Sequence, residues 1–122
     1  MKRVKASKPT KPTVPSSWSV EWMNEAKEDM KKFDHSTAVQ IYAGIRKVQQ
    51  NPLPQNEGGY GKPLGNRNGQ NLTGFLKIKF LAIGVRVVYR LVRTKKSMKI
   101  VVVSLRSDGE VYQAVAKRKP FV

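Results

Sequence analysis

Three consecutive segments with strand character, at 72–81, 85–93 and 98–106, constrain the fold of this chain more than any other feature. Each is short and rich in β-branched or aromatic residues, as strands are. The connections at 82–84 and 94–97 are short enough for antiparallel hairpins. We therefore expect the three segments to lie side by side in an antiparallel sheet.

Helical spacing dominates the region before these strands. Apolar residues recur every three or four positions over 24–33, which predicts a first helix. Thr37 and Gln40 have the spacing of a capping box, and Asn51-Pro52 ends the second helix that they begin. The apolar stripe of this second helix consists of Ala38, Ile41, Tyr42, Ile45 and Val48.

Two shorter elements complete the expected fold. Residues 17–22 alternate as a short strand, and Asp108 opens a last helix whose apolar face is Val111, Ala114 and Val115. The predicted class is therefore α+β: a small antiparallel sheet of about four strands, two N-terminal helices packed on one face, and a short C-terminal helix.

Two segments are expected to lack regular structure. Residues 52–71 are rich in glycine, proline and asparagine, and this composition predicts a long loop. Residues 1–17 carry five basic residues and three prolines with few large apolar side chains. We expect a flexible basic tail there, which leaves 18–122 as the folded domain.

The charge of the chain is strongly one-sided. Lysine and arginine number 24 against eight aspartates and glutamates, a formal net charge of +16. No acidic residue lies between 58 and 107, where eleven of the basic residues fall. A large polyanion is therefore the expected partner, with nucleic acid the first candidate and an anionic membrane or an acidic protein the alternatives.

Several function classes are disfavoured by what the sequence lacks. It has no cysteine, which excludes disulfides and thiol chemistry and fits a reducing cytoplasm, and its apolar runs are too short to span a membrane. His35 is the only histidine, and its place between two helices favours a capping or surface role. Without paired carboxylates in the basic half, or a histidine cluster, we expect neither a metal nor a cofactor.

Strand alternation predicts where the basic residues point. In the first of the three strands the apolar residues face the core, so Lys77 and Lys79 point to the opposite face. Arg86 and Arg90 alternate in the same way in the next strand, and Arg106 ends the last one. If the helices cover the apolar face, these side chains share an open cationic face suited to an RNA backbone. The alternative is a set of solvated lysines and arginines that merely discourage aggregation.

A set of short motifs follows in a fixed order from about Trp18 to Arg118. The motifs are Asn51-Pro52, Gly61-Lys62-Pro63-Leu64, Leu76-Lys77-Ile78-Lys79-Phe80, Gly84-Val85-Arg86-Val87-Val88-Tyr89, and Arg106 with Glu110-Val111-Tyr112 and Ala116-Lys117-Arg118. Each motif alone is unspecific. Together, in this order, they resemble the RelE/ParE toxin superfamily, and within it the RelE branch.

The resemblance implies the toxin of a type II toxin–antitoxin system, acting as a metal-independent endoribonuclease. Members of the RelE branch cleave mRNA in the ribosomal A site, where a 2′-hydroxyl attacks the adjacent phosphate and leaves a cyclic phosphate and a 5′-hydroxyl. The expected partners are therefore mRNA, the ribosome and a cognate antitoxin.

Matched motif by motif, the resemblance also implies site residues. Lys77 and Lys79 match the basic strand pair, Arg86 the phosphate-binding arginine and Tyr112 the general base. Arg106 matches an arginine assigned to leaving-group protonation or charge stabilisation, and charge stabilisation suits it better because arginine keeps its proton. We further expect RNA contacts from Arg90, Lys62, Lys117 and Arg118.

Two alternatives stay open at this stage. One is a ParE-like inhibitor of DNA gyrase without nuclease chemistry, and the other is a non-catalytic RNA- or ribosome-binding protein. The ParE branch generally lacks the full set of two lysines, two arginines and a tyrosine, so that set favours the nuclease. Three features depart from the RelE pattern: Ser104-Leu105 before Arg106, where a glycine is common, a long segment before Leu72, and the additional residues 1–17.

Overall fold

The computed structural model describes residues 17–67, 70–105 and 107–118. Within these ranges five strands form one sheet in the order β1-β5-β4-β3-β2. The strands are β1 (Ser19–Trp22), β2 (Lys62–Arg67), β3 (Gln70–Phe80), β4 (Val85–Val92) and β5 (Ser97–Ser104). Neighbouring strands within the set β2 to β5 are antiparallel to one another, whereas β1 runs parallel to β5. The predicted tail falls outside the described residues, apart from Ser17.

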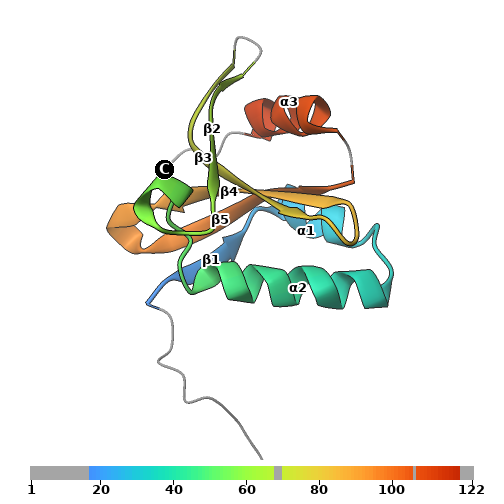
Figure 1. Ribbon diagram of the computed structural model, residues 1–122. Coiled ribbons are helices and arrows are strands. Elements are labelled where there is room, and N and C mark those ends of the chain that lie inside the picture. Colours follow the sequence, from blue (N-terminus) through green and yellow to red (C-terminus); the bar gives the residue numbers. More distant parts are fainter. Residues whose placement is uncertain (1–16, 68–69, 106, 119–122) are drawn as a thin grey trace, which may run out of the picture.

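The helices lie on both sides of this sheet (Figure 1). α1 (Asn24–Met30) and α2 (His35–Gln49) cover one face, and α3 (Asp108–Arg118) covers part of the other. The predicted α+β class is confirmed, with one strand more than expected in the described residues and with β1 parallel rather than antiparallel. In the described part of the chain, no helix is both long enough and apolar enough to cross a membrane.

Each face of the sheet has its own hydrophobic core. Val85, Val87 and Tyr89 of β4 point toward α1 and α2, where they pack with Ile41 and Ile45. The opposite core contains Leu64, Leu72, Phe75, Val88, Val101, Val102, Val111, Tyr112 and Val115. The second face, expected to be open, is therefore open only in part, because Val111 and Val115 of α3 are fully buried against it.

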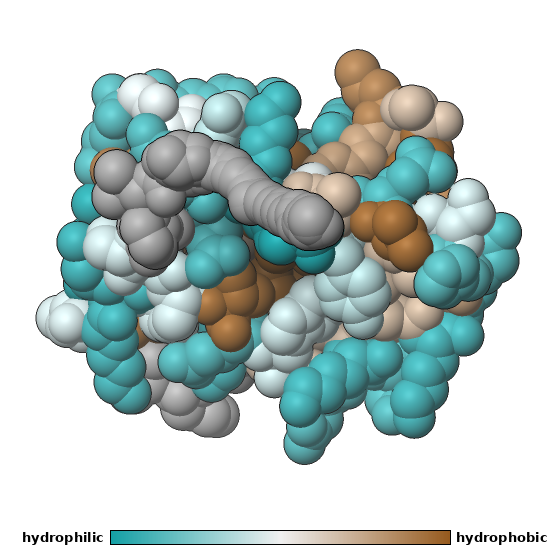
Figure 2. All heavy atoms as spheres, turned by 90° about the horizontal axis from the view of Figure 1, so that it is seen from below, coloured by the Kyte–Doolittle hydropathy of each residue, from teal (hydrophilic) through white to brown (hydrophobic). Residues whose placement is uncertain are grey.

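The outer surface of the helical layer is largely hydrophilic. Seen from the α2 side, hydrophobic side chains appear only as scattered patches among polar ones (Figure 2). Val39 and Tyr42 of α2 are 48% and 43% exposed. Tyr42 is therefore not part of the buried stripe in which it was predicted to lie. Its ring instead lies 5.6 Å from that of Trp22 in β1.

The start of α2 differs from the prediction. The N-cap is Asp34, whose Oδ1 accepts a hydrogen bond of 3.0 Å from the backbone N–H of Thr37. Thr37 therefore lies inside the helix and is not the cap. Hydrogen bonding from Thr37 holds the pKa of Asp34 below its ordinary value, because it stabilises the charged carboxylate. Aspartate at an N-cap satisfies a backbone donor that the helix itself leaves unpaired.

The predicted loop at 52–71 contains regular structure. It folds into the short 3₁₀ helix η1 (Gln55–Glu57) and the edge strand β2, which pairs with β3. Its start is fixed to the core by Tyr89, whose hydroxyl donates to the carbonyl of Pro52 at 2.6 Å. Burial raises the pKa of Tyr89 far above its ordinary value, so this hydroxyl keeps its proton and remains a donor.

Gly61 lies directly against this buried tyrosine. A Cβ at position 61 would overlap the Tyr89 hydroxyl oxygen and lie 3.0 Å from Cβ of Leu76. Only glycine therefore lets the chain approach closely enough to enter β2 at Lys62. The close approach gives a physical reason for a glycine immediately before the Lys62-Pro63-Leu64 motif.

We expect Gly61→Ala to lower the free energy of unfolding by about 1–3 kcal/mol, because the added methyl group overpacks this contact. Tyr89→Phe should cost a similar amount, about 1–3 kcal/mol, since it leaves the Pro52 carbonyl buried without its donor. In the double variant the methyl group no longer meets a hydroxyl. Its loss of stability should therefore be smaller than the sum of the losses in the two single variants. Urea unfolding of the four proteins measures this coupling, and strict additivity would contradict the contact.

Candidate active site

The strand register places five basic residues on the face of the sheet that carries α3. Lys62 in β2 is opposite Lys77 in β3, which is opposite Val88 in β4. Two residues after Lys77 in β3, Lys79 is opposite Arg86 of β4. Two residues before Lys77, Phe75 is opposite Arg90. Residues directly opposite one another point to the same face. We call Lys62, Lys77, Lys79, Arg86 and Arg90 the basic face.

Lys77 and Tyr112 form the centre of this arrangement. The Lys77 ammonium donates a hydrogen bond of 2.6 Å to the Tyr112 hydroxyl oxygen and lies 5.2 Å from the centre of its ring. Both side chains are almost enclosed, with 4% and 6% of their surface exposed. Strand β3 supplies the cation and α3 the phenol, so the pair exists only because α3 packs on the sheet.

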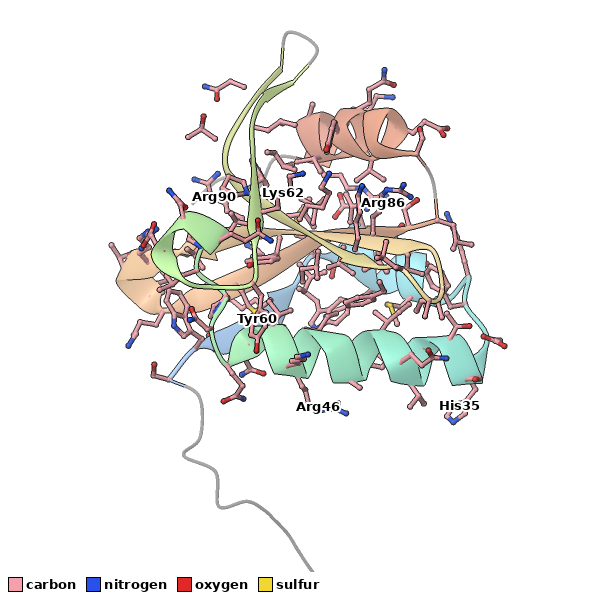
Figure 3. All side chains as sticks on the ribbon, viewed as in Figure 1. His35, Arg46, Tyr60, Lys62, Arg86 and Arg90 are labelled. Carbon is pink, nitrogen blue, oxygen red and sulfur yellow. The ribbon has the colours of Figure 1, made fainter. Side chains whose placement is uncertain are left out.

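The other basic side chains of this face are more exposed than Lys77. Lys62 and Lys79 are exposed, Arg86 is half-buried, and the Arg90 guanidinium lies 5.4 Å from the centre of the Phe75 ring. Figure 3 shows Lys62, Arg86 and Arg90 on one side of the sheet, whereas Arg46 and His35 project from α2 on the other side. Like charges on directly opposite strand positions are destabilising, so this face costs stability.

A hollow opens beside Lys77 at the edge of the sheet. Strand β2 pairs with β3 only as far as Lys77, which leaves the edge of β3 uncovered from Ile78 to Phe80. A hollow of about 280 Å³ lies there, lined by Gln55, Tyr60, Lys62, Lys77, Ile78, Lys79 and Leu81. Three of the five residues of the basic face therefore share one cavity.

The remaining predicted site residues lie elsewhere. Arg106 is outside the described residues. Lys117 lies on the exposed side of α3, beside Gln113 and Glu110. Arg118 is only partly exposed and forms an ion pair of 2.7 Å with Asp29 of α1. The structure thus brings Lys62, Lys77, Lys79, Arg86, Arg90 and Tyr112 together, but neither Lys117 nor Arg118.

Asp29 and Arg118 close an edge of the sheet. Strand β1 pairs with β5 only from Ser97 to Ile100. Beyond it, the Asp29 carboxylate accepts from the backbone N–H of Val103 at 3.0 Å, and the Arg118 guanidinium donates to the carbonyl of Val101 at 3.0 Å. The ion pair therefore occupies the place of the next strand and holds the end of α3 against β5.

Sequence reasoning missed Asp29, Tyr60 and Gln55. Asp29 could have been noticed, because it lies three positions after Ala26 and next to Met30 on the apolar side of a helix. An acid on such a stripe is buried only with a partner. Tyr60 lies in the glycine-rich run Gly58-Gly59-Tyr60-Gly61-Lys62, which is only a weak phosphate-loop signal, and no pattern indicates Gln55. The described residues contain no group of three or more histidine, aspartate or glutamate side chains arranged to hold a metal ion.

Comparison with known proteins gives a family match and a set of structural matches. The model of the family described as "ParE toxin of type II toxin-antitoxin system, parDE" matches residues 20–112. No curated protein matches by sequence. Among solved structures, the isolated RelE toxin of E. coli is 20% identical with a TM-score of 0.60, covering 84% of this chain and 98% of that one.

Two further structures have the same fold. A double arginine-to-alanine mutant of E. coli RelE in the free state is 19% identical with a TM-score of 0.65, covering 84% of this chain and 98% of that one. A chain of the RelBE2 toxin–antitoxin complex of Mycobacterium tuberculosis is 22% identical with a TM-score of 0.59, covering 76% and 100%. These structures have the same fold as this chain across nearly their whole length.

We expect Arg118→Met to lower the free energy of unfolding by about 2–4 kcal/mol, because it leaves the buried Asp29 carboxylate without its cation. The matched control is Lys117→Met, which removes an exposed charge from the neighbouring position and should change stability by less than about 0.5 kcal/mol. Equal effects of the two substitutions in urea unfolding would show that the ion pair does not hold α3.

Proposed function

This chain belongs to the ParE toxin family of type II toxin–antitoxin systems, in the RelE/ParE superfamily, and we propose that it inhibits translation as an mRNA-cleaving endoribonuclease. The observation that carries the proposal is the hydrogen bond between Lys77 and Tyr112 within a face of basic side chains. A protein that only bound phosphates would not need a phenol buried against a lysine at the centre of that face. The reaction would need no metal.

The proposed reaction is an attack within the RNA strand. The 2′-oxygen of one nucleotide forms a bond to the neighbouring phosphorus, and the bond from that phosphorus to the 5′-oxygen of the next nucleotide breaks. The proton of the 2′-hydroxyl passes to a base, and the departing 5′-oxygen takes up a proton. The products are a cyclic phosphate and a 5′-hydroxyl, and no oxidant or co-substrate is required.

The basic face has a clear part in this reaction. Negative charge builds up on the phosphate oxygens as the fifth bond forms, and fixed cations at that place stabilise it. Lys77, Lys79 and Arg86 are within one another's reach across two paired strands, so they can surround a single phosphate. Lys62 and Arg90 extend the same face to the flanking phosphates, and the resemblance adds Arg106 as a further charge stabiliser.

Tyr112 is the proposed base, with Lys77 as its positioning partner. The ammonium group of Lys77 holds the phenol oxygen in place through the hydrogen bond that it donates. Because only 6% of Tyr112 is exposed, RNA must widen the space between α3 and β3 to bring its 2′-hydroxyl into contact. A substrate held in alignment would help greatly, and alignment can contribute about 7–11 kcal/mol in well-oriented systems. We propose that the ribosomal A site supplies it.

The second proposed partner is a cognate antitoxin. Structures with the same fold are described as complexes with antitoxins, in E. coli and in Mycobacterium tuberculosis. A formal net charge of +16 suits an acidic, partly disordered segment that folds on binding. Such a partner would also relieve the repulsion among the side chains of the basic face.

We expect Tyr112→Phe to reduce the rate of mRNA cleavage about 10²–10⁴-fold, the usual contribution of a general base. Lys77→Met should reduce it by at least about 10²-fold, because it removes a charge from the reacting phosphate. The measurement is the mapping of mRNA 5′ ends after induced expression, followed by cleavage of mRNA on purified ribosomes. The control is Arg46→Met, which removes one charge from the opposite side of the molecule and should cleave like the unchanged protein.

The family match itself favours one other function, inhibition of DNA gyrase, because the matching model is that of ParE toxins. A supercoiling assay with purified gyrase distinguishes the two functions. We expect no inhibition of supercoiling at concentrations that cleave mRNA. Gyrase inhibition without RNA cleavage would overturn the nuclease proposal, and salt-sensitive RNA binding without any cleavage would reduce the protein to a binding module.

A further inference from the structure

The hollow beside Lys77 contains groups that phosphate chemistry does not require. Tyr60 and Gln55 come from the segment before β2, and Leu81 follows the end of β3. An aromatic ring, an amide and an apolar side chain thus stand next to three lysines. At about 280 Å³ the hollow lies just below the range of about 300–1,000 Å³ typical of small-molecule sites.

Tyr60 lines this hollow and also contacts α2. Its side chain is 45% exposed, and the Lys47 ammonium of α2 lies 5.7 Å from the centre of the ring. The backbone N–H of Tyr60 donates to the carbonyl of Asn51 at 3.1 Å. Figure 3 shows Tyr60 below Lys62, next to α2.

The segment that carries Tyr60 and Gln55 is held at both ends. The Gln55 N–H donates to the carbonyl of Gly61 at 2.7 Å, which closes the segment into a ring. Glu57 forms a two-pronged ion pair with Arg93 next to β4, with distances of 3.1 and 2.6 Å. A segment fixed in this way loses little conformational entropy when a ligand binds. The backbone that carries the Tyr60 ring is therefore preorganised for binding.

An exposed aromatic ring beside cations is the arrangement by which proteins bind single-stranded nucleic acid. Bases stack on the ring while lysines hold the backbone phosphates. The Gln55 amide offers both a donor and an acceptor to the edge of a stacked base. A peptide or an acidic protein would use the lysines but would not need a flat ring at this place.

We propose that the hollow is a nucleobase subsite, in which Tyr60 stacks on the base next to the cleaved phosphate and Gln55 contacts its edge. The inference rests on the proposed function, since the phosphate in question is the one held by Lys77 and Lys79. Tyr60 then selects where the RNA is cut. Larger purine rings give more stacking area, so the subsite favours a purine.

The test separates base binding from cleavage. The probe is an eight-nucleotide 2′-deoxy strand, which cannot be cut because it has no 2′-hydroxyl, together with eight versions that each lack one base. For the unchanged protein, we expect loss of one particular base to weaken binding about 5- to 100-fold, the range for one stacked base. That difference should persist in Tyr60→Phe and fall below about twofold in Tyr60→Ala.

The matched control is Tyr42→Ala, which removes a tyrosine of similar exposure from α2 and should keep the full difference. If no missing base matters, or if Tyr60→Ala keeps the difference, the subsite does not exist, even where mRNA cleavage is normal. If the base difference depends on Tyr60 but no mRNA is cleaved, the subsite stands and the nuclease proposal fails. Mapped 5′ ends from Tyr60→Ala should also lose their base preference next to the cut, whereas a merely structural role would lower cleavage equally at all sites.

Discussion

The ion pair between Asp29 and Arg118 joins three elements that lie far apart in the chain. Asp29 is in α1, Arg118 is 89 residues later in α3, and both also bond to the backbone of β5. The helices on the two faces of the sheet are therefore connected around its edge. Because α3 carries Tyr112, the position of the phenol above Lys77 depends on this connection. In a chain with few acids, one of them is buried to hold the helix that carries Tyr112.

The basic face brings like charges close together within the sheet. Lys62 and Lys77 are directly opposite on paired strands, as are Lys79 and Arg86, and like charges there weaken the sheet. The apolar core beneath α3 provides the opposing stabilisation, since Val88, Val101 and Val102 surround the basic positions with buried surface. A polyanionic ligand would remove the repulsion. The fold thus concentrates positive charge on the part of the sheet where the proposed RNA would bind.

Much of the fold could be predicted because alternation and helical spacing are local properties. They located β3, β4, β5 and both N-terminal helices, and they placed Lys77, Lys79 and Arg86 on one face. The predictions were wrong where contacts between segments far apart in the sequence determine the local structure. Strand β2 contains proline and glycine, which usually argue against a strand, and it forms because β3 offers an edge and Gly61 fits against Tyr89. The face opposite α1 and α2 was expected to be open, but α3 folds back onto it.

The sequence by itself determined the class of the fold, the concentration of positive charge and the family to which the chain belongs. These follow from periodicity, composition and the order of motifs, which need no knowledge of distant contacts. The tertiary structure alone decided which basic residues meet: Lys77 bonds to Tyr112, whereas Arg118, expected to bind RNA, pairs with Asp29. It also placed Tyr60 and Gln55 beside the lysines. The physical reason is that such pairings depend on the packing of α3 and on the end of β2, where chain segments far apart in sequence come into contact.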